Sequence, residues 1–210
     1  AREIAAASGR QQAMREVSVL PSTEVLAGAL REVHEGHLRN AFGLLDVRVP
    51  RVDMNALFFR LTRDPADGRA EALELLDNVL EGTTKTLLLR LYEPSSARVL
   101  PTAGDARARI EALLREDPSE WITAGALHAA SAHHLAGASD LARRHLRHPS
   151  AIARETALFA LAAIAGPREA LAAAGALRDD PSPAVRALLA GLETGTGTVP
   201  GGTRSPAGAA

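Results

Sequence analysis

The stretch HPSAIARETALFALAAIAGPREALAAAGALRDDPSPAVR, residues 148–186, decides the fold of this chain. It starts with His148-Pro149, contains two helix-like apolar runs separated by a Gly-Pro pair, and reaches the next such run through Asp180-Pro181. Asp117-Pro118 opens a similar run upstream, so the three prolines are 31 and 32 residues apart. A recurrence of this length is typical of helical repeats, in which each unit buries its apolar face against its neighbours. We therefore predict an all-α chain that forms an α-solenoid of antiparallel helix hairpins.

The recurrence weakens toward the N-terminus. Asp64-Pro65 starts the same kind of run, but at a longer interval. We predict degenerate helical repeats or an N-terminal helical part over residues 1–116, regular HEAT-like repeats over 117–193, and a disordered tail over 194–210. Val199 is the only large apolar residue of this tail, so the segment cannot bury enough surface to offset the entropy of ordering it.

The composition agrees with a helical chain and excludes several classes of protein. Apolar residues make up 46% of the sequence but aromatic residues only 3%, whereas strands favour aromatic and β-branched types. The net charge of -1 gives no global basic field that would attract nucleic acid or anionic lipid. The absence of cysteine excludes disulfides and thiol nucleophiles and fits a cytoplasmic location. The longest apolar run is about half of the roughly 20 residues that a membrane span needs, so we predict no span.

Helix ends can be placed from local signals. Proline cannot donate a backbone hydrogen bond, so the helices before Pro118, Pro149 and Pro181 are expected to end there. Asp105 is a typical N-cap residue and is expected to start a helix. Leu161 lies in a broad apolar stripe, which predicts a core position between two neighbouring helices. Together with the apolar periodicity, these signals predict helices over residues 3–17, 22–47, 53–63, 69–81, 85–92, 105–116, 119–136, 139–145, 150–165, 168–177 and 183–192.

The segment from Ile152 to Arg186 resembles a short HEAT repeat. The shared elements are a helix that opens with an apolar-Arg pair, a Gly-Pro turn, a second helix that ends in Ala-Leu, and an Asp-Pro start of the next unit. The resemblance extends over about residues 117–193. It implies a scaffold with a curved surface whose concave side is lined by the helices over 150–165 and 183–192. It implies no particular chemistry, because this fold hosts scaffolds, lyases, hydroxylases and nucleic-acid enzymes.

The upstream segment from Leu38 to Leu91, with ALELLDNVL at 72–80, has a narrower resemblance. It is similar to the cytoplasmic HEAT-like region of bacterial proteins that join such repeats to a nucleotide-transporter-like or major-facilitator-like membrane domain. This resemblance implies a cytoplasmic regulatory region of a membrane-tethered parent chain. The start at Ala1, without an initiator Met or a leader, gives the same expectation of a segment from a longer protein.

No catalytic constellation and no cofactor motif stands out, so we expect a non-enzymatic protein without a cofactor. His145 and His148 are three residues apart and could place two imidazoles on one metal ion. However, no carboxylate completes a ligand set at helical spacing. His148 also occupies the place that Asp117 and Asp180 hold in the other two Pro turns, so a turn role is favoured over a metal site.

The candidate interaction surface consists of a basic run, two repeated arginines and the only tryptophan: Arg143, Arg144, Arg147, Arg154, Arg186 and Trp121. Arg154 and Arg186 each stand five residues after a proline, where we expect bonds to a neighbouring turn, with Asp179 or Asp180 as the partner of Arg154.

Trp121 is expected to pack on the preceding helix, and of the adjacent Phe58 and Phe59 one is expected to be exposed. The Arg143 to Arg154 stripe leaves open a nucleic-acid binder or a repeat-based enzyme. Because stacking aromatic residues are missing and acids balance the charge, we favour a protein partner, or another domain of the same chain.

Overall fold

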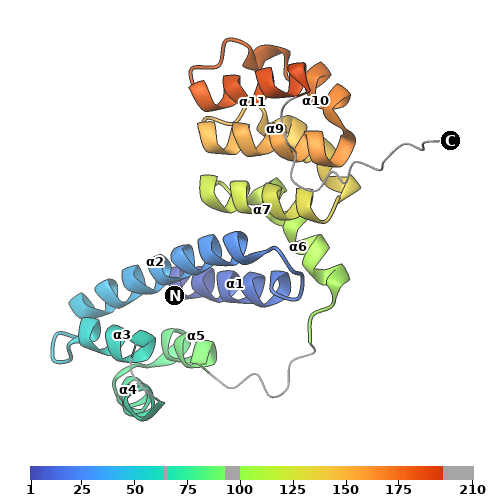
Figure 1. The fold of residues 1–210 in the computed structure, drawn as a ribbon. Coiled ribbons are helices and arrows are strands. Elements are labelled where there is room, and N and C mark those ends of the chain that lie inside the picture. The colour runs from blue at the N-terminus through green and yellow to red at the C-terminus, as the bar shows by residue number, and fades with distance from the viewer. Residues whose placement is uncertain (64–65, 93–99, 196–210) are drawn as a thin grey trace. The chain divides into compact units, whose positions relative to one another are not determined.

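The computed structural model describes residues 1–63, 66–92 and 100–195. These residues form α-helices and two short 3₁₀ helices with no strand among them, which confirms the all-α prediction (Figure 1). The Asp64-Pro65 dipeptide lies outside the described residues, and so do residues 196–210, which make up most of the predicted tail. Thr194 still belongs to the last helix, which ends at Gly195 in the left-handed conformation that glycine favours.

The predicted helices agree with the observed ones within a few residues at most ends. The observed α-helices are α1 (Arg2–Val17), α2 (Glu24–Arg48), α3 (Met54–Arg63), α4 (Ala66–Val79), α5 (Gly82–Tyr92), α6 (Ala103–Glu116), α7 (Glu120–Ala132), α8 (Ser139–His145), α9 (Ala151–Ala165), α10 (Pro167–Ala173) and α11 (Pro183–Thr194). The 3₁₀ helices are η1 (Ala136–Ala138) and η2 (Gly175–Leu177).

Two predicted helix ends and one predicted helix cap were wrong. The helix expected to run to residue 136 ends at Ala132, because His134 adopts a φ of 46° that no α-helix can continue. The helix expected to reach residue 177 stops at Ala173, and η2 replaces its last turn. The N-cap of α6 is Thr102 rather than Asp105. Asp105 occupies the third helical position and completes a capping box, in which each side chain accepts a bond from the other residue's backbone N–H.

The chain divides into two compact units. Unit 1 comprises Ala1–Arg15 and Leu30–Leu100, and unit 2 comprises Glu16–Ala29 and Pro101–Ala210. Helices α1 and α2 therefore contribute residues to both units. No helix within the described ranges combines the length and the apolarity that crossing a membrane requires.

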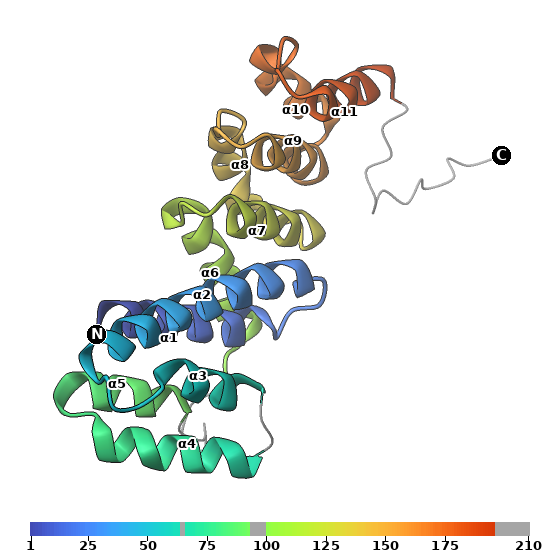
Figure 2. The same cartoon turned by 90° about the vertical axis from the view of Figure 1, so that its left-hand side faces the viewer.

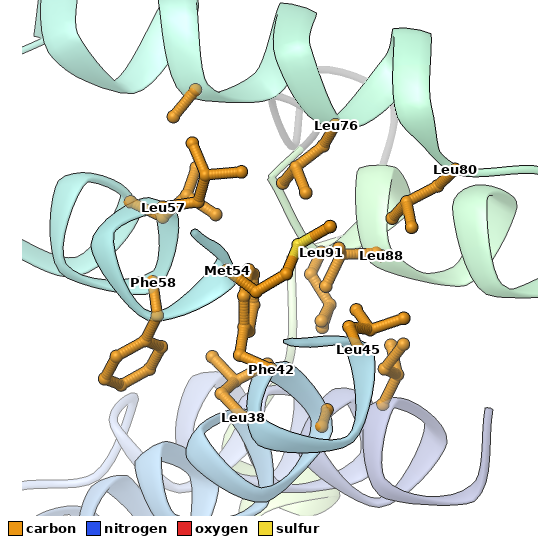
Figure 3. Close-up of a cluster of buried hydrophobic side chains, with 14 of the residues drawn as sticks. Leu38, Phe42, Leu45, Met54, Leu57, Phe58, Leu76, Leu80, Leu88 and Leu91 are labelled. Carbon is orange, nitrogen blue, oxygen red and sulfur yellow. The ribbon is translucent and has the colours of Figure 1, made fainter. Parts of the chain in front are cut away.

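Unit 1 is held together by a leucine-rich core with an aromatic centre. Phe42, Met54, Leu76 and Leu88 come from four different helices, have no exposed surface and lie together in Figure 3. The rings of Phe42 and Phe58 have centroids 5.7 Å apart. Phe58 is buried, whereas half of the neighbouring Phe59 is exposed, which confirms that only one of the pair enters the core.

The core of unit 2 is built around α9, which contacts α7, α8, α10 and α11. Figures 1 and 2 show α7, α9 and α11 as successive layers. Contact on several sides explains the broad apolar stripe of α9, and Leu161 is fully buried as predicted. Alanine supplies much of this surface, and its small side chain lets the helix axes approach closely. The buried residues of α9 are Ala153, Ala157, Leu158, Ala160, Leu161 and Ala162.

The start of α2 packs on α7 within unit 2 through a glycine. A Cβ added to Gly125 would lie 2.9 Å from Cα of Leu26, closer than side chains tolerate. The two helices also begin with the same sequence pattern: Pro-Ser, four residues, then Ala-Gly-Ala-Leu, at 21–30 and at 118–127. Gly28 takes the place of Gly125 in the first copy, and a Cβ there would meet no atom within 4 Å.

We expect the replacement Gly125→Ala to destabilise unit 2 by about 1–3 kcal/mol, because the new methyl group overlaps the α2 backbone. Gly28→Ala is the matched control. With open space around it, this change is expected to stabilise the protein by about 0.5–1 kcal/mol through helix propensity. Urea unfolding of both variants measures the difference, and shifts of the same sign and size would contradict the packing role of Gly125.

Candidate functional site

Three turns with the same internal hydrogen bond precede α7, α9 and α11. In each of these Pro-Ser turns the residue before the proline accepts a hydrogen bond from the serine N–H, as in an Asx turn. The distances are 2.9 Å from Ser119 N to Asp117 Oδ1, 3.1 Å from Ser150 N to His148 Nδ1, and 2.9 Å from Ser182 N to Asp180 Oδ1. The ring nitrogen of His148 thus takes the place of a carboxylate oxygen, which confirms its predicted turn role.

Arg154 links two of these turns. Its Nε and Nη2 donate to the two carboxylate oxygens of Asp180 at 2.7 and 2.8 Å, and its Nη1 donates to the carbonyls of His148 and Pro149 at 2.8 Å each. Asp180 is only 5% exposed, so the pair is bidentate and largely shielded from water. The prediction of a turn partner is confirmed, and the partner is Asp180. The hydrogen bond from Arg154 lowers the pKa of Asp180 below its ordinary value.

The residues that stand five places after the proline in α7 and α11 do not form such a bridge. Arg186 is exposed and donates through Nη1 to the carbonyl of Asp180, but within the described residues it forms no ion pair with a carboxylate. Thr123 takes this place in α7, where its buried hydroxyl makes no hydrogen bond to any described residue. Of the three positions, only Arg154 therefore forms a full bridge between turns.

The histidines of unit 2 also serve the fold. His133 Nε2 lies 2.8 Å from the carbonyl oxygen of Pro21, His134 Nδ1 lies 3.1 Å from that of Ala163, and His145 Nε2 lies 2.8 Å from that of Leu114. Each ring thereby ties its own segment to a different part of unit 2. Burial lowers the pKa of His145, which favours the neutral ring. Across the described parts of the chain no three metal-ligating side chains are grouped so as to hold an ion.

The basic run predicted from the sequence is divided by the fold. Arg154 is buried in its ion pair. Arg143 donates to Asp140 at 3.2 Å and to Glu169, so two acids neutralise it. Arg144 and Arg147 are exposed, and neither forms an ion pair with any residue that the structure describes. Of the basic run, only the guanidinium groups of Arg144 and Arg147 are therefore free to bind an anionic ligand.

These two arginines border a groove of about 620 Å³ at the end of α8. The other side of the groove is formed by the last turn of α10 and by η2, where all lining side chains except that of Leu177 are small. Its lining residues are Arg143, Arg144, Leu146, Arg147, Ala172, Ala173, Gly175, Ala176 and Leu177. The charge pattern of the sequence pointed to the arginines but not to the small residues, although the run Ala-Ala-Ala-Gly-Ala at 172–176 was a usable signal.

Trp121 is 55% exposed, so it is not a core residue, and its expected packing on the preceding helix stays a prediction. It stands three residues after Pro118, and Ile152, which is 39% exposed, stands three residues after Pro149. The third member of this register is the exposed Ala184. The position points away from the core in all three helices, and the alanine was the signal that could have revealed this. We call Trp121 and Ile152 the apolar pair.

Comparison of the chain with protein-family models, with curated proteins and with solved structures gives no match. Inferences about function therefore depend on the geometry of unit 2.

Replacing Asp180 by Asn is expected to destabilise the protein by about 3–5 kcal/mol, because it leaves Arg154 buried without a charge partner. Asp179→Asn is the matched control. Asp179 is the exposed neighbour and the alternative partner in the sequence prediction, so its replacement should change stability by less than about 0.5 kcal/mol. Chemical unfolding at neutral pH measures both, and equal effects would contradict the bridge.

The same pair predicts a pH dependence. Because the fold lowers the pKa of Asp180, its stabilisation is fully present above the ordinary value of 3.8 and is lost as the pH falls through the folded-state pKa. The parent should therefore lose more stability than Asp180→Asn when unfolding is followed from neutral to strongly acidic pH. An identical acid slope in the two proteins would show that this carboxylate is not shifted.

Proposed function

We propose that this chain is a non-enzymatic HEAT-like scaffold, in which α7 to α11 form successive hairpins of an α-solenoid that binds a protein partner. The recurrence of 31 and 32 residues supports this, because it coincides with turns that share one hydrogen-bond pattern. Packing of α9 between its neighbours is also what stacked repeats require. Another domain of the same chain is an equally suitable partner.

The observation that carries this proposal is the apolar pair. Trp121 and Ile152 occupy the same register in α7 and α9, which pack on each other, and both side chains are exposed. Tryptophan is the residue most enriched among the dominant contacts of protein interfaces, where burial of its large ring contributes much of the affinity. Side chains presented at the spacing of the repeat suit a surface that docks on another protein.

Several groups that would suggest an enzyme already have structural partners. Shifted pKa values gather at catalytic sites, but the shifts of Asp180 and Arg154 arise from their bond to each other, and that of His145 arises from burial. A nucleic-acid binder is less well supported, because only Arg144 and Arg147 of the basic run lack an ion pair among the described residues, and these two can neutralise only about two phosphates. The proposal includes a cytoplasmic location, with the regulatory region of a transporter-like membrane protein as the alternative setting for the upstream segment.

Short random peptides selected on the immobilised protein from a display library test the proposal. We expect the selected peptides to bind the double variant Trp121→Ala, Ile152→Ala at least tenfold more weakly, because the apolar contact area is lost. Trp121 is the only tryptophan, so binding should also shift its fluorescence toward shorter wavelength.

Phe59→Ala is the control for loss of an exposed aromatic ring, since Phe59 is 51% exposed and lies in unit 1. It should leave affinity unchanged. Selected peptides that bind the double variant as tightly as the parent protein would refute the role of the apolar pair.

A further inference from the structure

The groove beside α8 has a definite charge arrangement. Of its three arginines, Arg143 is neutralised by Asp140 and Glu169, whereas Arg144 and Arg147 are exposed and have no acidic partner among the described residues. Arginines at the C-terminal end of a helix interact favourably with its dipole, but this leaves their N–H donors free. A guanidinium group offers these donors in a planar fork that matches a carboxylate. The groove therefore favours an anionic occupant.

The small residues across from the arginines determine what kind of anion fits. Together with Leu177, the residues Ala172, Ala173, Gly175 and Ala176 make this side of the groove apolar, without an aromatic ring or a polar side chain. Main chain and short side chains can lie against such a surface. Bases of a nucleic acid would lack stacking partners, which normally contribute about 1–3 kcal/mol each. These features favour an acidic peptide over a nucleic acid.

The chain's own C-terminal sequence does not have the required charge. Residues 196–210 contain Arg204 and no aspartate or glutamate. The complementary charge is therefore not supplied by residues 196–210, and a partner protein is the source that agrees with the apolar pair.

We propose that the groove binds an extended acidic segment of the partner protein. Arg144 and Arg147 hold carboxylates of this segment, and its small side chains lie on the alanine surface formed by α10 and η2. This inference rests on the proposed function and gives that function a chemical class of partner.

A labelled peptide of repeating Asp, Gly and Ala is the probe, and the same peptide with Asn for Asp is its neutral counterpart. We expect the acidic peptide to bind at least tenfold more tightly than the neutral one, and less tightly as salt is raised, because exposed charges are screened. The double variant Arg144→Gln, Arg147→Gln should lose this preference. Ala172→Glu should also lose it, since it places a negative charge on the opposite side of the groove.

The control double variant Arg51→Gln, Arg107→Gln removes the same net charge from exposed sites outside the groove and should bind like the parent. Equal binding of the two peptides, or full binding by Arg144→Gln, Arg147→Gln, would overturn the inference. Single-stranded DNA that binds more tightly than the acidic peptide through the same arginines would overturn the assignment to a peptide. If selected peptides depend on Trp121 and Ile152 but not on Arg144 and Arg147, the inference fails while the proposed scaffold function stands.

Discussion

The packing of α7, α9 and α11 depends on how the residue before Pro118, Pro149 and Pro181 bonds the backbone of the turn. Proline ends one helix and removes a donor, and the chain must then turn sharply enough for the next helix to pack on the last. The side chain of the residue before the proline accepts a hydrogen bond from the N–H of the serine after it, and this bond fixes the turn. When the acceptor is Asp180, the same carboxylate also receives the fork of Arg154, so one residue defines a turn and joins it to its neighbour. The spacing of the helices and the direction of their exposed positions follow from these turns.

This arrangement explains why the basic run is not one surface. In sequence, Arg143 to Arg154 form a continuous stripe of positive charge. In the fold, the turn at His148 separates them, so Arg154 faces the interior of the turn region while Arg144 and Arg147 border the groove. One of the two acids that pair with Arg143, Asp140, is close in sequence, but the other, Glu169, comes from α10, two helices further along the chain. Charge counted along a sequence cannot reveal such pairings.

The all-α class and most helix ends could be predicted because each depends on local chemistry. Proline positions, caps and apolar period are properties of a few adjacent residues, and so is the turn role of His148. Exposure of Trp121 was missed because bulky apolar residues are usually buried, and only comparison with Ala184 at the same register corrects that expectation. The groove was missed because it forms between segments that are about 30 residues apart. The choice between Asp179 and Asp180 likewise required the three-dimensional path of the turn.

The buried hydroxyl of Thr123, which has no hydrogen-bond partner among the described residues, bears on which residue can stand five places after each proline. The residue five places after a proline lies in register with the acceptor of the next turn: Thr123 with His148, and Arg154 with Asp180. The neutral Thr123 is thus matched with the imidazole of His148, whereas the cationic Arg154 is matched with the carboxylate of Asp180. If Thr123 and Arg154 exchanged places, an arginine would stand in register with a histidine, and the buried Asp180 would stand in register with a threonine. The two residues are therefore not interchangeable, although each stands five places after the proline of a Pro-Ser turn.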